Sequence, residues 1–190
     1  MTTHSSLTIN ELGAGAAAPA DRAADLFGEE RQRVYRETDR LFVPLLLLEW
    51  IALIIVALAV GPEGWRQHVE DPNLRVWLLI ALGGVVTIIP IALVRFRPGT
   101  ALTRYTIAAC QMFHSGILIS LSGGRFETHF HVFCSLVILS LYRDWRVFIP
   151  ATLVVALDHV LRAAYVPVSV YGAFAAPAWK SLEHLAWVIF

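Results

Sequence analysis

Charged residues are scarce in this sequence, and they form short clusters between long apolar runs. Only 16% of the 190 residues are Asp, Glu, Lys or Arg, and the formal net charge is zero. Domains that bind nucleic acid carry a basic patch or stripe. The sequence has neither, which excludes nucleic acid as a partner.

Cysteine is scarce as well, and the N-terminal segment lacks the features of a signal peptide. Cys110 and Cys134 both lie in apolar segments, where we expect free thiols packed as small hydrophobic groups. The first residues have neither a basic region nor a strong apolar core. Insertion into a membrane would therefore depend on the first transmembrane helix itself.

Apolar residues, by contrast, are abundant. They make up 57% of the chain, and the mean hydropathy is +0.62; soluble domains are about 45–50% apolar. Six apolar segments are judged against the roughly 20 residues that cross a bilayer core: Leu41–Val60, Val76–Val94, Leu102–Leu121, Phe130–Tyr142, Val147–Ala164 and Trp179–Phe190. The pattern predicts an all-α polytopic transmembrane helical bundle of about six helices. The last segment is too short to cross, so we expect a truncated last helix with an output domain beyond it.

The polar segments before the first apolar run divide into two parts. Residues 1–20 are small and polar, and they are predicted to be a disordered cytoplasmic tail. Residues 21–40 carry mixed charge and are predicted to form an amphipathic charged helix or linker. Residues 41–190 then form the six-helix transmembrane domain.

The arginines indicate the orientation of this domain. Three clusters precede the first segment, follow the second and follow the fourth: Arg31, Arg33, Arg36 and Arg40; Arg95, Arg97 and Arg104; Arg143 and Arg146. In an alternating topology all three fall on one side, which the positive-inside rule assigns to the cytoplasm. We therefore expect a multi-pass protein of the inner membrane with a cytoplasmic N-terminus.

Four histidines are predicted to lie at one depth near the outer side: His129, His131, His159 and His184. Ionisable side chains are costly inside a bilayer and mark functional sites there. Imidazoles that converge from separate helices are typical ligands of a metal or haem. Because His129 and His131 are two residues apart, both can bind one metal only if the backbone near Thr128 is irregular.

Acidic residues accompany these histidines. Glu127 lies four residues before His131, so it shares a helical face with His131 and is the best extra ligand. Asp158 and Glu183 are expected to orient the neighbouring imidazoles. Asp158 has an alternative, which is to pair with Arg125 or Arg162.

Two further pairs have the spacing of metal ligands on a helix. Cys110 and His114 are four residues apart, and His131 and Cys134 are three apart, so either pair suits a soft metal such as copper. The residues do not choose between copper, iron, zinc and haem b. The alternative is that the histidines, like Glu49 in the first apolar segment, only make hydrogen bonds between helices.

Several motifs together resemble a known family. The runs GGRFETHFHVF and YRDWR, the pair Asp158–His159 and the segment LEHLAW resemble the membrane-embedded N-terminal sensor region of bacterial (hybrid) sensor histidine kinases, over most of residues 35–190. The resemblance implies a sensory input domain, a cytoplasmic kinase module in cis and a homodimer, with no catalytic activity in this segment itself. The chain departs from the family at Ser120, where a histidine is usual, and at His114 and Cys134, which are unusual.

Three functions remain open at this point. The first is a membrane sensory input domain with a histidine-rich metal or haem site at the outer leaflet. The second is a metal-dependent membrane oxidoreductase, which would need an open coordination position. The third is a structural bundle without a cofactor, in which the polar residues join the helices.

Overall fold

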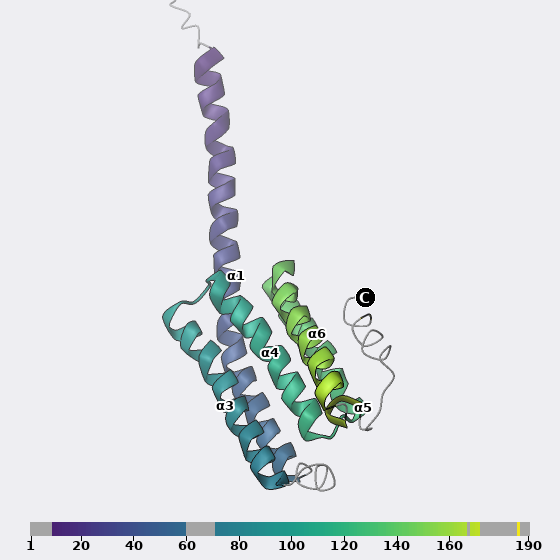
Figure 1. Cartoon of the computed structure of the whole chain (residues 1–190). Coiled ribbons are helices and arrows are strands. Elements are labelled where there is room, and N and C mark those ends of the chain that lie inside the picture. The colour runs from purple at the N-terminus through teal and green to yellow at the C-terminus, as the bar shows by residue number, and fades with distance from the viewer. Residues whose placement is uncertain (1–8, 60–70, 167, 172–185, 187–190) are drawn as a thin grey trace, which may run out of the picture.

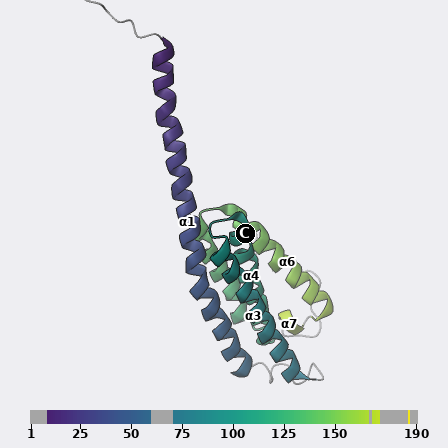
Figure 2. The same cartoon turned by 90° about the vertical axis from the view of Figure 1, so that its left-hand side faces the viewer.

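The chain folds into a bundle of helices, one of which extends far beyond the others (Figures 1 and 2). The structure is a computed structural model, and it describes residues 9–59, 71–166, 168–171 and 186. Its helices are α1 (Ile9–Ala59), α3 (Pro72–Phe96), α4 (Ala101–Leu121), α5 (Phe126–Leu139), α6 (Phe148–Tyr165) and α7 (Val168–Tyr171). Two 3-10 turns, η1 (Ser140–Tyr142) and η2 (Trp145–Val147), connect α5 to α6. Within these ranges there is no strand, so the predicted all-α fold is confirmed.

The helix α1 runs without a break through 51 residues. It begins at Ile9, so it includes residues 9–20 as well as the charged segment 21–40. Alanine has the highest helix propensity of all residues, and alanines occupy positions 16–18. Residues 21–33, which are almost all exposed, project beyond the bundle as the long shaft in Figure 1.

The apolar segments predicted from the sequence match the helices closely. Three helices are long and apolar enough to cross a membrane, namely Asp21–Ala59, Asn73–Phe96 and Trp145–Tyr165, and the shorter apolar helix Phe126–Tyr142 joins them. These helices indicate that the chain is embedded in a membrane. The fourth predicted segment starts at Phe130, whereas α5 starts at Phe126. The sixth segment lies outside the described residues, apart from Ala186.

The helix α4 occupies the centre of the bundle, where it packs against α1, α3, α5 and α6. Several of its buried residues are polar, among them Thr103, Arg104, Gln111, His114 and Ser115. This composition explains why α4 is absent from the strongly apolar helices, although the sequence predicts that it spans the membrane. Its neighbours shield it, so it can carry these polar side chains alongside its buried hydrophobic ones.

Close packing of α1 on α3 depends on two glycines. A Cβ atom at Gly84 would lie 3.0 Å from Cζ2 of Trp50, and one at Gly83 would lie 3.2 Å from Cδ1 of the same indole. The indole N–H of Trp50 donates a hydrogen bond of 3.1 Å to the carbonyl oxygen of Ile80. Small residues thus let the indole lie against the α3 backbone, as in many membrane helix pairs.

Asp39 joins three segments at one end of the bundle. Its carboxylate accepts a hydrogen bond of 2.6 Å from the backbone N–H of Gly99 and one of 2.7 Å from the hydroxyl of Tyr142. Gly99 has a φ of 79°, a conformation that favours glycine. The ring of Tyr142 also stacks on Phe42 with a centroid separation of 5.6 Å. The turn between α3 and α4 and the η1 turn are therefore both fixed to α1.

Arg104 extends this junction. Its guanidinium donates to Asp144 at 3.0 Å and lies over the ring of Tyr35, 4.3 Å from the centroid. Tyr105 provides a second ring at 5.1 Å. We call the following residues the end clamp: Tyr35, Asp39, Arg104, Tyr142 and Asp144. Because the end clamp joins segments that border all three arginine clusters, it places the clusters at one end of the bundle, as the sequence predicts.

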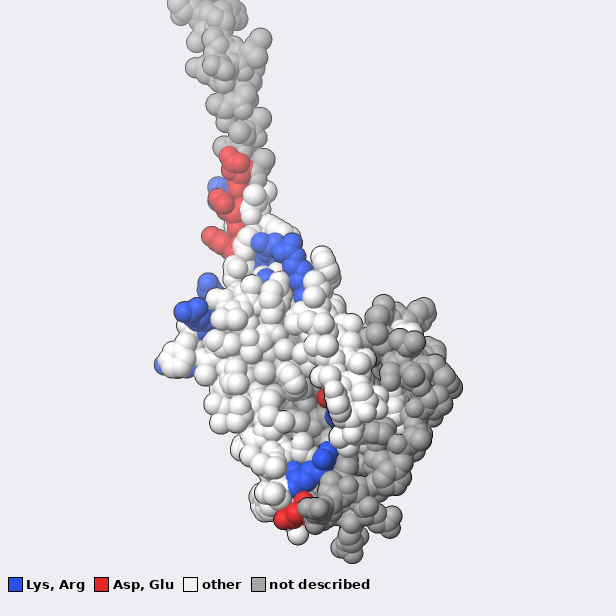
Figure 3. Space-filling view, viewed as in Figure 1, with Lys and Arg blue, Asp and Glu red and all other residues white. Residues whose placement is uncertain are grey.

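The outer surface of the bundle is largely apolar between its two ends. Large hydrophobic residues such as Leu48, Ile55, Ile88 and Leu153 are more than half exposed. Figure 3 shows a broad band with little charge on this face, with Arg, Asp and Glu gathered mainly toward the two ends. An apolar exterior over a core that contains polar as well as hydrophobic side chains suits a bundle whose solvent is lipid.

Candidate functional site

The two histidines of α5 face different parts of the bundle. The helix is regular from Phe126 onward, so the irregular backbone required near Thr128 for a joint site is not present. Side chains two positions apart on an α-helix point about 200° away from each other. His129 and His131 accordingly have different partners, and they form two sites that we treat in turn.

His129 meets His159 of α6. Their ring centroids are 5.8 Å apart, with the ring planes inclined by 73°. Nδ1 of His129 lies 3.0 Å from the carbonyl oxygen of Arg125, and Nδ1 of His159 lies 3.1 Å from that of Val155. A carbonyl partner assigns the ring hydrogen to Nδ1 and makes Nε2 the lone-pair nitrogen, an arrangement that is common in metal-binding histidines. We call these two residues the histidine pair.

Acidic and basic groups adjoin the histidine pair on α6. Asp158 forms an ion pair with Arg162, one of the partners expected for it, and its Oδ2 lies 3.4 Å from Nδ1 of His159. The Asp158–Arg162 ion pair packs against Gly116 of α4, where a Cβ atom would lie 3.1 Å from Oδ1 of Asp158. Asp158 therefore holds Arg162 and borders His159, and it does not pair with Arg125.

The predicted metal ligands are only partly brought together. Among the residues that the structure describes, no three His, Cys, Asp or Glu side chains gather closely enough to hold a metal. Glu127 is exposed in the first turn of α5, and Arg125 caps the same helix. His184 and Glu183 lie outside the described residues. The metal or haem site thus stays a prediction, of which the histidine pair is the described part.

His131 faces the bundle interior and contacts both α4 and α1. Its Nδ1 lies 2.9 Å from the hydroxyl oxygen of Ser115 and 3.3 Å from that of Ser135. Its Nε2 lies 3.6 Å from Oε1 of Glu49. One imidazole therefore connects three helices, α1, α4 and α5.

Gln111 lies at the centre of the same contacts. It is fully buried, and its amide N–H groups donate to Oε1 of Glu49 and, at 3.2 Å, to the hydroxyl of Ser135. The expected role of Glu49 as a hydrogen-bonding residue between helices is thereby confirmed. We call Glu49, Gln111, Ser115, His131 and Ser135 the central network. The sequence signal for it was two polar residues, Glu49 and Gln111, within apolar runs.

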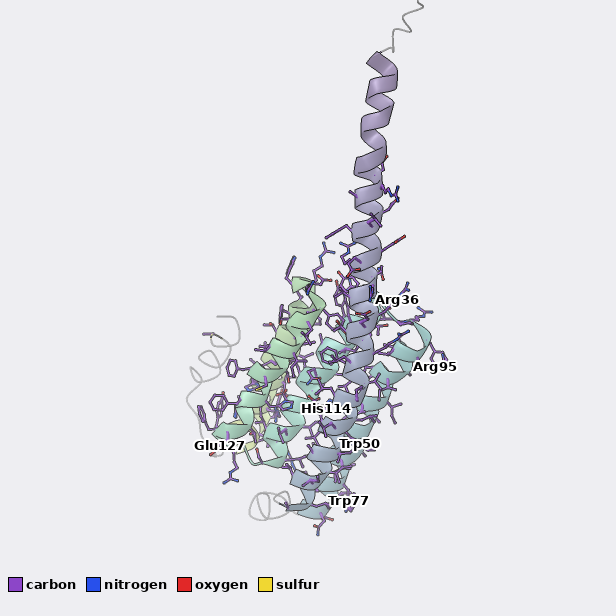
Figure 4. All side chains as sticks on the ribbon, turned by 180° about the vertical axis from the view of Figure 1, so that it is seen from behind. Arg36, Trp50, Trp77, Arg95, His114 and Glu127 are labelled. Carbon is purple, nitrogen blue, oxygen red and sulfur yellow. The ribbon has the colours of Figure 1, made fainter. Side chains whose placement is uncertain are left out.

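His114 makes a third set of contacts, with α3. Its Nε2 lies 2.9 Å from the hydroxyl oxygen of Thr87, which donates to the carbonyl of Gly83, and its Nδ1 lies 3.0 Å from the carbonyl oxygen of Cys110. Figure 4 shows His114 inside the bundle, between the end with Arg36 and Arg95 and the end with Trp77 and Glu127. Cys110 is buried and Cys134 is exposed. The soft-metal pairs that the spacing suggests, Cys110 with His114 and His131 with Cys134, stay a prediction.

Comparison of the chain with protein-family models, with curated proteins and with solved structures finds no match. The arguments for a function therefore rest on the geometry above and on the motifs in the sequence.

Proposed function

We propose that this chain is the membrane-embedded sensory input domain of a bacterial signalling protein. The observation that carries the proposal is the histidine pair, in which α5 and α6 bring two imidazoles together in a membrane-embedded bundle. Ionisable groups in such a position mark ligand or ion sites. The resemblance to the sensor regions of histidine kinases supports the same function, with a kinase module in cis and a homodimer in the inner membrane.

The ligand that fits the histidine pair is a metal ion or haem. His129 and His159 would supply two imidazole ligands, and copper, iron and haem b all accept such ligands. His184 is the third candidate ligand. Asp158 would fix the orientation of His159 through its contact with that ring.

A ligand at the histidine pair would act on the packing of α6. His159 is buried, and α6 packs mainly on α4, with the Asp158–Arg162 pair lying at Gly116. Drawing His129 and His159 together would shift α6 along α4 by about 1–2 Å, as at other switching helix interfaces. The end clamp would pass such a shift to α1, because Asp144, which caps the η2 turn just before α6, binds Arg104 and contacts Tyr35.

The test combines metal content with a distance between helices. Spin labels would be placed at Arg33→Cys and Ile149→Cys, two exposed sites on α1 and α6, in a background with Cys110→Ala and Cys134→Ser. Metal content, the visible spectrum and the distance between the labels would be recorded before and after chelation. We expect bound metal or haem, and a distance that shifts by about 1–2 Å when it is removed.

The controls are matched histidine variants. His129→Ala and His159→Ala should lose both the metal and the shift, whereas His131→Gln, on the other face of α5, should keep both. Metal that binds without any shift would contradict the sensory function. Protein without metal in every preparation would contradict the ligand site.

A second candidate function is a bundle without a cofactor. The contacts of His114 with Thr87 and of His131 with Ser115 favour it, because these imidazoles already join helices by hydrogen bonds. In that case the protein would contain no metal, and His129→Ala and His159→Ala would change only its stability.

A further inference from the structure

The central network contains a carboxyl group in a place where a charge is poorly compensated. The side chain of Glu49 is only 10% exposed, and it lies within the apolar part of α1. Removing an isolated carboxylate from water costs several kcal/mol even after the surroundings relax. Its described partners are the neutral amide of Gln111 and the imidazole of His131, with Nε2 at 3.6 Å. Neither Arg nor Lys is paired with it in the described part of the chain.

Two oxygen atoms in this network are buried and lack a hydrogen-bond partner. They are Oε2 of Glu49 and Oε1 of Gln111. Both are acceptors when the carboxyl group is ionised, so neither can satisfy the other. A buried acceptor without a donor costs about 1–3 kcal/mol.

One added hydrogen resolves both deficits. The amide of Gln111 already donates to Oε1 of Glu49. A carboxylic acid and a primary amide can pair through two hydrogen bonds, N–H to carboxyl oxygen and O–H to amide oxygen. The second bond would join Oε2 and Oε1, the two atoms that lack partners. The acid form also removes the charge, as in other apolar sites where a neutral carboxyl group donates a hydrogen bond.

We propose that the central network is a proton-binding site in the membrane interior. Glu49 carries one proton at neutral pH, and its O–H group donates a hydrogen bond to the amide oxygen of Gln111. The ligand is the hydrogen ion, and the site lies between α1 and α4. The proposal does not rest on the sensory function, since the site would hold its proton in any bundle with this packing.

The other titratable groups around the site leave this assignment intact. His114 on α4 neighbours His131, and it binds Thr87. On α3 the charged residues are Arg75 and Arg95, near its two ends. On α6 the residues are Asp158, His159 and Arg162, which lie in its last two turns. On α5, His129 faces the histidine pair, and Cys134 is exposed.

Infrared spectroscopy of the purified chain tests the proposal directly, since a protonated carboxyl group has a C=O stretching band that a carboxylate lacks. We expect this band at neutral pH in the wild type, and its loss on raising the pH. The variant Glu49→Gln should lack one carboxyl's share of the band. Glu127→Gln, at an exposed position, should retain the whole of it. Equal bands at neutral pH in the wild type and in Glu49→Gln would overturn the proposal.

Two further measurements keep the test decisive. If Glu49→Gln does not fold, wild-type protein labelled with carbon-13 glutamate should show an isotope shift of the acid band. Among the glutamates whose burial the structure describes, Glu49 is the one that is not exposed, and an unshifted band would exclude it. Replacing sodium with choline at constant pH should leave the band unchanged. A band that disappears when sodium is added would mean that the site takes a metal cation instead, which overturns the proposal.

Discussion

At the scale of single residues, the polar side chains inside the bundle each join particular helices. Thr87 and His114 join α3 to α4, and Glu49 and Gln111 join α1 to α4. His131 joins α5 to α1 and to α4. In a membrane these bonds replace part of the hydrophobic driving force that packs helices in water. Losing one partner leaves the other buried and unsatisfied, so single substitutions here should have measurable effects.

Tyr142 provides a test of one such bond. Tyr142→Phe removes the hydroxyl that Asp39 binds but keeps the ring that stacks on Phe42. We expect the free energy of unfolding in detergent to fall by about 1–3 kcal/mol, the cost of a buried acceptor that loses its donor. Tyr165→Phe, at a position that is 81% exposed, is the control and should change nothing. An unchanged stability of Tyr142→Phe would show that Asp39 does not depend on this hydroxyl.

The residue contacts could be predicted only in part from the sequence. The ion pair of Asp158 with Arg162 follows from their spacing of four, and it was among the expected pairs. The opposite directions of His129 and His131 also follow from helical geometry. Spacing does not say which face of α5 meets which helix, so the contact of His131 with Glu49 was not foreseen. That contact depends on how the helices rotate about their axes, which packing decides.

At the scale of helices, the sequence predicted the described apolar segments well, because hydropathy alone decides which runs enter lipid. Helix ends were harder to predict. The predicted segment starts four residues after α5 does. The hydropathy pattern missed the first turn because it holds Glu127 and other residues that are not strongly apolar. The helix α1 likewise begins before the charged segment 21–40, since alanine favours helix without signalling burial.

The contact between α1 and α3 gives a prediction at this scale. Gly84→Leu places a branched side chain where even a Cβ atom would lie 3.0 Å from Trp50. The two helices must separate, and we expect a loss of about 1–3 kcal/mol in unfolding free energy, typical of overpacking. Gly28→Leu is the matched control, since nothing lies within 4 Å of a Cβ atom there. It should be neutral or slightly stabilising, because leucine favours helix more than glycine does.

Equal stability of the two glycine variants would contradict the close approach of α1 and α3. The thermal midpoint in detergent and the resistance to dodecyl sulfate both measure the effect. Adding Trp50→Ala to Gly84→Leu should restore part of the lost stability, because it makes room for the new side chain.

At the scale of the whole molecule, exposure in the structure has two meanings. Residues on the shaft of α1 are exposed to water, whereas residues on the bundle between its ends are exposed to lipid. Leu26 is 57% exposed on the shaft, and Cys134 is exposed on the bundle. Their chemical accessibility should therefore differ although both lie on the protein surface.

Thiol labelling in membrane vesicles measures this difference. A charged, membrane-impermeant maleimide should modify Leu26→Cys, in a background without other cysteines, and leave Cys134 unmodified in a Cys110→Ala background. The proposed cytoplasmic N-terminus adds a direction: Leu26→Cys should react in inverted vesicles and not in intact cells. Labelling of Cys134 as fast as Leu26→Cys would mean that the apolar band does not face lipid.

The central position of α4 bears on how the protein is synthesised. A helix that carries Arg104, Gln111 and His114 is a poor candidate for leaving the translocon by itself, since each such side chain opposes partitioning into lipid. The short turn at residues 97–100 joins α4 to the apolar helix α3. The two helices would then enter the bilayer as one hairpin, with α3 carrying α4. Lengthening that turn would therefore impair biogenesis before it affected the finished fold.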